Sequence, residues 1–174
     1  MFSLDLGYAE HHSDAQHVEN FENPGGGIGG VSYVFAEMDR RTIDATLRAD
    51  ILFTRNVSLQ LYAQPYMTVG EFSNARQLAR PASYEFDEAD DVPEFDPATV
   101  SDYDFKYSAV NVNAVLRWEY APGSTFYLVW KQGRDLYEDR GSVGGFDPAL
   151  DPGGMFDSEP ENVVLAKLTY WFSI

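Results

Sequence analysis

The chain alternates apolar and polar residues with a period of two over much of its length. Successive side chains of a strand point to opposite faces, so this period predicts strands with one apolar and one polar face. The longer runs match the ~9–11 residues that a tilted strand needs to cross a bilayer. Every second residue is apolar, and the residues between are mostly polar, in segments 43–53, 57–67, 110–120 and 164–174, with shorter runs at 2–8 and 126–131.

Two short connections join neighbouring strands. A loop of three residues after Phe53 pairs Leu47 with Ala63, and a five-residue loop further along pairs Leu116 with Trp130. Directly opposed residues of an antiparallel pair share a face, so both pairings keep the apolar face continuous. The sequence therefore predicts two tight hairpins.

Long acidic segments at 10–30, 70–105 and 135–161 separate these hairpins. They hold 22 of the 28 Asp and Glu residues and most of the Pro and Gly, which is typical of solvated loops. Short turns that alternate with long loops are the layout of a bacterial outer-membrane barrel, with its turns in the periplasm and its loops outside. A turn at 38–41 is the alternative that would break this alternation.

The fold class predicted is all-β, with antiparallel up-and-down strands in one domain, the C-terminal portion of a transmembrane β-barrel. Single-chain barrels begin at eight strands, and unpaired backbone groups at an open edge are costly in lipid. Because about six strands are predicted here and Met1 opens no signal peptide, we expect an incomplete barrel. The predicted strands cover 2–9, 31–53, 57–69, 107–120, 126–134 and 162–174.

Each face of such a sheet has a predicted role. The polar face would line the barrel interior, either as a packed network or as a conducting lumen. Aromatic residues of the apolar face would sit at the membrane interface near the periplasmic side. The predicted lumen-lining residues are Asp44, Arg48, Asp50, Gln60, Gln64, Asn111, Asn113, Arg117, Glu119, Lys131 and Lys167. The predicted interface aromatics are Phe53, Trp118, Tyr120, Phe126, Tyr170 and Phe172.

Alternation also fits a soluble β-sandwich or a lipocalin-like barrel that binds a ligand such as a carbohydrate, with the same pattern turned inside out. The uniform run lengths, the loop asymmetry and the aromatic placement favour the membrane barrel.

Composition narrows the chemistry. A net charge of −16 argues against nucleic acid as a partner, and the lack of Cys removes thiol chemistry. His11, His12 and His17 are weak metal candidates within the first loop, and calcium in the acidic loops is a second alternative. The acidic runs are Asp87, Glu88, Asp90, Asp91, Glu94 and Asp96, and Asp147, Asp151 and Asp157. No catalytic arrangement stands out, so an enzyme is not predicted, and solvated loops explain both groups better than metal sites do.

Several tracts together resemble a known family. They are Tyr33–Asp39 (YVFAEMD), Ser58–Tyr66 (SLQLYAQPY), Asn113–Ser124 (NAVLRWEYAPGS) and Asn162–Phe172 (NVVLAKLTYWF). From about residue 31 onward the chain resembles the C-terminal end of the bacterial "domain of unknown function 5916" family. In that family a module similar to family 9 carbohydrate-binding domains precedes a long membrane barrel.

The resemblance implies a bacterial outer-membrane location, contact with outer-membrane lipid and a link to glycans. It transfers no catalytic residue. We expect the C-terminal strand to engage the barrel assembly machinery. The predicted function is that of a membrane anchor or solute channel of a glycan-associated surface protein, without catalysis on this segment.

Overall fold

The computed structural model describes residues 1–139 and 153–172, and strands dominate these ranges. The helical turns within these ranges are two short 3₁₀ helices, η1 (Pro97–Tyr103) and η2 (Gly153–Phe156). The strands are β1 (Phe2–Glu22), β2 (Val31–Thr54), β3 (Val57–Leu78), β4 (Phe86–Glu88), β5 (Phe105–Ala121), β6 (Ser124–Asp139) and β7 (Glu161–Thr169).

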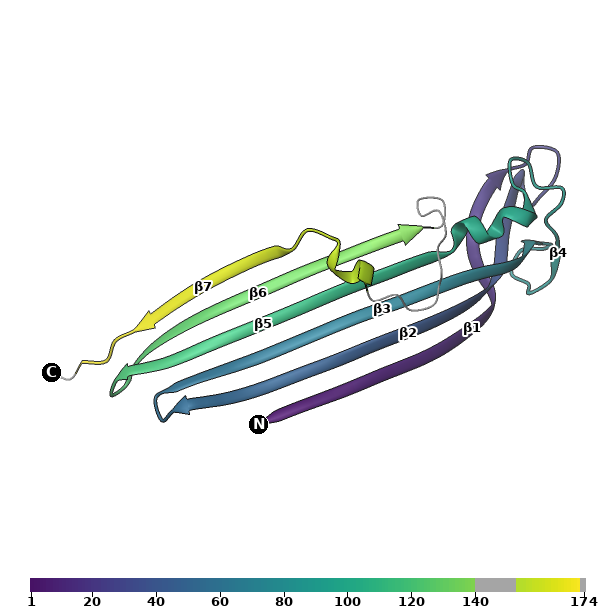
Figure 1. Cartoon of the computed structure of the whole chain (residues 1–174). Coiled ribbons are helices and arrows are strands. Elements are labelled where there is room, and N and C mark those ends of the chain that lie inside the picture. Colours follow the sequence, from purple (N-terminus) through teal and green to yellow (C-terminus); the bar gives the residue numbers. More distant parts are fainter. Residues whose placement is uncertain (140–152, 173–174) are drawn as a thin grey trace.

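All strands belong to one antiparallel sheet with the order β1-β2-β3-β5-β6-β7, and the short β4 pairs with the far end of β3. This confirms the predicted all-β, up-and-down fold. The sheet is open in the described part of the chain, with β1 and β7 as its edges (Figure 1). The start of β1, the end of β7 and the two tight hairpins lie at one end of the sheet, here called the turn end, and the longer connections lie at the opposite loop end.

β2 runs without interruption from Val31 to Thr54, as predicted for segment 31–53. Residues 38–41 pair with β1 on one side and with β3 on the other, so the alternative turn at this place is wrong.

Three strands are longer than predicted. β1 continues to Glu22, β3 to Leu78 and β6 to Asp139, so the long connections are correspondingly shorter. The chain between β1 and β2 spans 23–30 rather than 10–30. The extra residues are largely polar, so their sequence resembles that of a loop. In the structure they are strand, because β1 pairs with one edge of β2 and β3 pairs with the other. β7 is shorter at its end and stops at Thr169.

The hairpin registers are partly as predicted. Leu47 pairs with Ala63, but a bulge near Phe53 pairs Thr54 with Val57 across a two-residue turn. In the second hairpin Leu116 pairs with Leu128 instead of Trp130, so that prediction is wrong by two residues. Pro122 followed by Gly123 at φ 75° fits a two-residue turn, which is tighter than the expected loop of five.

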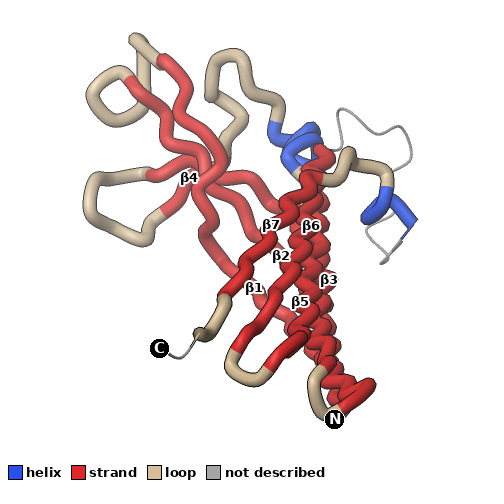
Figure 2. The backbone as a smooth tube through the Cα atoms, turned by 90° about the vertical axis from the view of Figure 1, so that its left-hand side faces the viewer, coloured by secondary structure: helices blue, strands red, loops and turns tan. Residues whose placement is uncertain are grey.

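The loop end bends away from the rest of the sheet. β1 has irregularities in its pairing after Ser13 and after His17, and such bulges bend and twist a strand. The far parts of β1 and β2 accordingly turn away from the line of β5 and β6, as Figures 1 and 2 both show. A small core of Val34, Ala89 and Val92, with Phe21 and Phe95 against it, fills the bend.

Candidate functional site

One face of the sheet, here called the polar face, carries every predicted lumen-lining residue. Register fixes this placement, because directly paired residues share a face. One row across the sheet contains Ser3, Arg48, Tyr62, Asn113, Lys131 and Val163. Neighbouring rows pair Asp44 with Tyr66, Asp50 with Gln60, Gln64 with Asn111, Arg117 with Tyr127 and Lys167, and Glu119 with Thr125. Their role in lining a lumen stays a prediction.

Contacts on the polar face are local. Arg117 lies 3.1 Å from Glu119 along the same strand. The guanidinium carbon of Arg48 lies 5.5 Å from the ring centre of Tyr62, whose hydroxyl donates to Gln64 Oε1 at 2.9 Å. These side chains are half-buried or exposed, so this face is a polar surface and not a packed core.

The opposite face, here called the apolar face, is continuous from β1 to β7. One row contains Phe2, Ala49, Leu61, Ala114, Trp130 and Val164. Large side chains on this face are open to the surroundings, with 77% of Leu6 and 67% of Leu168 exposed. Contiguous apolar patches above a few hundred Å² are rare on soluble monomers and mark interaction surfaces. The apolar face therefore needs a partner or a lipid environment.

The predicted interface aromatics gather at the turn end of the apolar face. Trp118 pairs with Phe126, and its ring lies 6.0 Å from that of Tyr120. The Tyr120 hydroxyl donates to the carbonyl of Thr169 at 2.9 Å. Phe53 precedes the first hairpin turn, and Tyr170 and Phe172, with rings 6.4 Å apart, follow β7. The structure thus brings these residues to one end of the sheet, and their membrane contact stays a prediction.

A row of four charged residues around one valine crosses the sheet where the apolar face ends. We call it the boundary row. Its members are paired in register across five strands, and they are Glu10, Arg41, Val69, Lys106 and Glu138. Next to this row, Arg41 Nη2 lies 2.5 Å from Glu71 Oε2. The sequence offered no sign of this row, because its members come from five strands and meet only through register.

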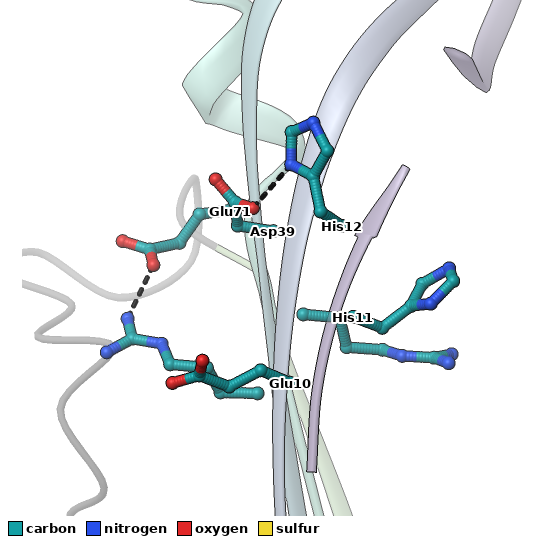
Figure 3. Close-up of a pocket in the computed structure, with 7 residues that line it drawn as sticks. Glu10, His11, His12, Asp39 and Glu71 are labelled. Carbon is teal, nitrogen blue, oxygen red and sulfur yellow. Dashed lines mark hydrogen bonds and ion pairs between the residues drawn. The ribbon is translucent and has the colours of Figure 1, made fainter. Parts of the chain in front are cut away.

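A pocket of ≈ 520 Å³ lies beside this row, with Glu10, His12, Asp39 and Glu71 among its lining (Figure 3). His12 Nδ1 lies 2.7 Å from Asp39 Oδ1, and Nε2 lies 3.1 Å from Asp14 Oδ1. The hydrogen bond to Asp39, and then that to Asp14, raise the pKa of His12 above its ordinary value. The pocket therefore favours a protonated imidazole held between two carboxylates.

The three histidines do not form a common site. His11 and His12 are consecutive residues of β1, so their side chains leave opposite faces, and Figure 3 shows His11 turned away from Asp39. His17 Nε2 contacts Asn20, and its ring packs against Phe35. No group of three or more metal-binding side chains occurs within 1–139 and 153–172.

Helix η2 packs on the apolar face near the boundary row. Met155 joins a small cluster with Met67 and Val110. The Phe156 carbonyl accepts a hydrogen bond from Arg134 at 2.9 Å, and the guanidinium lies 5.6 Å from the Phe156 ring centre.

Beneath η2, Lys106 Nζ lies 3.5 Å from Glu138 Oε2, and only 8% of the Lys106 side chain is exposed. A side chain added at Gly154 would begin 3.4 Å from that ammonium group. Helix η2 thus covers a largely buried ion pair.

The segment between β4 and β5 covers the polar face at the loop end. Val92 and Phe95 pack over Val34. The Tyr103 hydroxyl donates to Glu19 Oε2 at 2.6 Å, and burial together with this hydrogen bond raises the pKa of Tyr103 to about 12. This end of the polar face is therefore closed over β1 to β3.

Three of the acidic residues considered for calcium lie in or next to regular structure. Asp96 caps η1 by accepting from the amide of Ala98, and Asp87 and Glu88 belong to β4. Asp147 and Asp151 lie outside the described residues.

Among the described residues, no helix has the length and apolar character needed to span a membrane. The chain matches the family model described as "Domain of unknown function (DUF5916)" over residues 1–173. The match begins at residue 1, so it is wider than the resemblance noted from about residue 31. No curated protein and no solved structure matches the chain.

Proposed function

This chain belongs to the DUF5916 family, and we propose that it forms part of the wall of a bacterial outer-membrane β-barrel. In this proposal the apolar face contacts lipid, the polar face lines the interior, and the loop end is external. The wall acts as a membrane anchor or a solute channel for a surface protein.

The observation that carries the proposal is the bounded apolar face. It runs on β2 from Ile43 to Phe53, ten residue steps and about 33 Å of strand. At the usual barrel tilt this length spans about 25 Å, the height of the apolar band of outer-membrane barrels. Aromatic residues border the face at the turn end, and the boundary row borders it at the loop end.

The open edges agree with a wall that is completed by other strands. Backbone groups of β1 and β7 that lie at the edges would cost several kcal/mol each if they met lipid unpaired. A barrel of this kind therefore includes further strands that pair with both edges.

Two parts of the polar face differ in how far they are covered, and this difference bears on the choice between anchor and channel. The 89–103 segment covers it over β1 to β3 at the loop end, whereas the part along β5 and β6 carries open grooves. This favours an interior that is narrowed at one side and leaves a polar path along β5 and β6. The proposal includes that this surface protein is associated with glycans.

The rival function is a soluble ligand-binding β-domain. Fractionation of cells that express the chain with a secretion signal separates the two. We expect the chain to stay in the membrane pellet after carbonate washing and to be released by detergent. Recovery in the soluble fraction after the wash would contradict the barrel proposal.

Orientation can be tested in the same cells, because the chain has no Cys and single cysteines can be placed freely. A cysteine at the exposed Gly25 should react with an impermeant maleimide on intact cells, and one at Asn56 should react only after lysis. The reverse pattern would overturn the proposed orientation.

A further inference from the structure

A groove on the polar face follows β5 and β6 towards β7. Two adjoining cavities of ≈ 420 Å³ and ≈ 190 Å³ form it, and both are lined by Asn111, Gly133 and Glu161. Register explains this shared centre, because Gly133 pairs with Asn111 on one side and with Glu161 on the other.

Gly133 creates the free space at the centre. It lies in the middle of β6, where glycine is unfavourable unless a close approach of another group requires it. A Cβ placed there would meet only Asn111 Oδ1, at 3.8 Å. The space beside Gly133 is therefore not filled by any atom of the described chain.

The groove offers donors and acceptors that the protein does not use. The side chains of Asn111, Asn113 and Lys131 have no hydrogen-bond or ion-pair partner in residues 1–139 and 153–172. The carboxylates of Asp135 and Glu161 also have no such partner in these residues. An amide presents both an acceptor oxygen and two donor hydrogens, so these groups together match a ligand that donates and accepts at closely spaced points.

An aromatic wall stands at one end of the groove. Tyr107 lines the larger cavity, and its ring lies 6.2 Å from that of Tyr66. Tyrosine combines an apolar ring face with a polar tip, and this combination suits a ligand that has both C–H faces and hydroxyl groups.

Charge on the polar face argues against an ionic ligand. Acidic and basic side chains are interspersed, so no strong field of one sign selects anions or cations. The groove itself is lined by charges of both signs, the acidic Asp135, Glu159 and Glu161 and the basic Lys131 and Arg134.

We infer that this groove binds a short neutral oligosaccharide. Sugar hydroxyls would pair with Asn111, Asn113 and Glu161, and a C–H face of one ring would pack on Tyr107. As a solute site inside a barrel the inference rests on the proposed function, but the groove itself can be tested without a membrane.

The test uses the full chain in detergent micelles with three neutral trisaccharides, cellotriose, maltotriose and mannotriose. Saturation-transfer NMR detects binding, and titration gives the affinity. We expect at least one trisaccharide to bind and the polycation spermidine and the zwitterion triglycine not to compete. Binding of none of the trisaccharides, or displacement of the bound sugar by spermidine, would overturn the inference.

Substitutions locate the site. Gly133→Trp should fill the groove and weaken binding by more than about tenfold, whereas Gly133→Ala should change it little. Asn111→Ala should weaken binding about three- to tenfold, as expected for one lost hydrogen bond. Leu128→Trp is the matched control, because it adds the same ring to β6 on the apolar face. Equal affinity in Gly133→Trp and Leu128→Trp would place the ligand elsewhere and refute the inference.

Carbonate fractionation of each variant separates this failure from that of the proposed function. A chain that stays in the membrane and binds no trisaccharide refutes the groove and leaves the barrel wall standing. A chain that is released by carbonate and binds a trisaccharide through Gly133 refutes the barrel wall and leaves the groove standing.

Discussion

The two halves of β2 use opposite residues for the same face of one continuous strand. Near the loop end, Val34, Ala36 and Met38 lie on the polar face and are buried. Nearer the turn end, the same face carries Asp44, which is half-buried, and Arg48, which is exposed. On the other face, Glu37, Asp39 and Arg41 give way to apolar residues from Ile43 onward, whereas Tyr33 and Phe35 are apolar nearer the loop end. The difference shows that the surroundings of each face decide whether polar or apolar side chains are stable on it. The strand conformation is the same in both halves.

What covers each half is different. In the loop half the 89–103 segment folds over the polar face and builds a small water-excluded core. In the turn half, η2 covers the apolar face only around Met67 and Val110, and we propose that lipid covers the rest. The following predictions test this division, from the largest expected effect to the smallest.

The largest effect is expected at the boundary itself. Glu138→Leu removes the partner of the buried Lys106 ammonium and should cost about 3–5 kcal/mol, because an uncompensated buried charge remains. The double variant Lys106→Met with Glu138→Leu should recover most of this loss. Urea unfolding in lipid vesicles measures both. A double variant as unstable as the single one would show that the ion pair is not the cause.

Charge on the apolar face comes next. Leu61→Arg lies at mid-height of the turn half and should cost about 2–4 kcal/mol in vesicles, as for arginine near the bilayer midplane. Ser73→Arg is its control, because Ser73 lies on the same face beyond the boundary row and is exposed. Similar losses for both variants would remove the distinction between the two halves.

The core of the loop half should respond locally. Val34 is fully buried, so Val34→Ala should weaken this core by about 2 kcal/mol through lost packing. Hydrogen exchange should then quicken in residues 31–38 and stay unchanged in 45–51. Quickening of both segments to the same extent would mean that the halves unfold as one unit.

The smallest effect concerns the pH response of the pocket. Because the pKa of His12 is raised in the folded chain, its contribution to stability is complete below about pH 6.5 and is lost as the pH rises through the folded pKa. NMR titration should show that Asp39→Asn lowers this pKa more than Asp14→Asn does. An unchanged titration in Asp39→Asn would contradict the role of this hydrogen bond.

Period-two alternation predicted the turn half well, because one face there is consistently apolar. It located β2 and β5 and placed Arg48, Asn111 and Lys131 on one face. It failed in residues 10–22, where β1 is an edge strand with polar residues on both faces. It also misjudged the second hairpin, because the turn at Pro122 and Gly123 is tighter than the length of the connection suggests.

The boundary row, the His12 pocket and the packing of η2 on the sheet could not be predicted from the sequence. Their members, such as Lys106, Glu138 and Met155, are joined only by the exact register and by the return of a long connection onto the sheet. The groove at Gly133 was invisible for the same reason, since a glycine gains meaning only through its cross-strand neighbours.

The inverted polarity of β2 has a consequence for folding fidelity. If β2 slipped by one residue against β1 and β3, every side chain would change face. Here such a slip would take Val34, Ala36 and Met38 out of their core and would move Ile43 and its neighbours off the apolar face. Both halves of β2 thus favour the same register against β1 and β3.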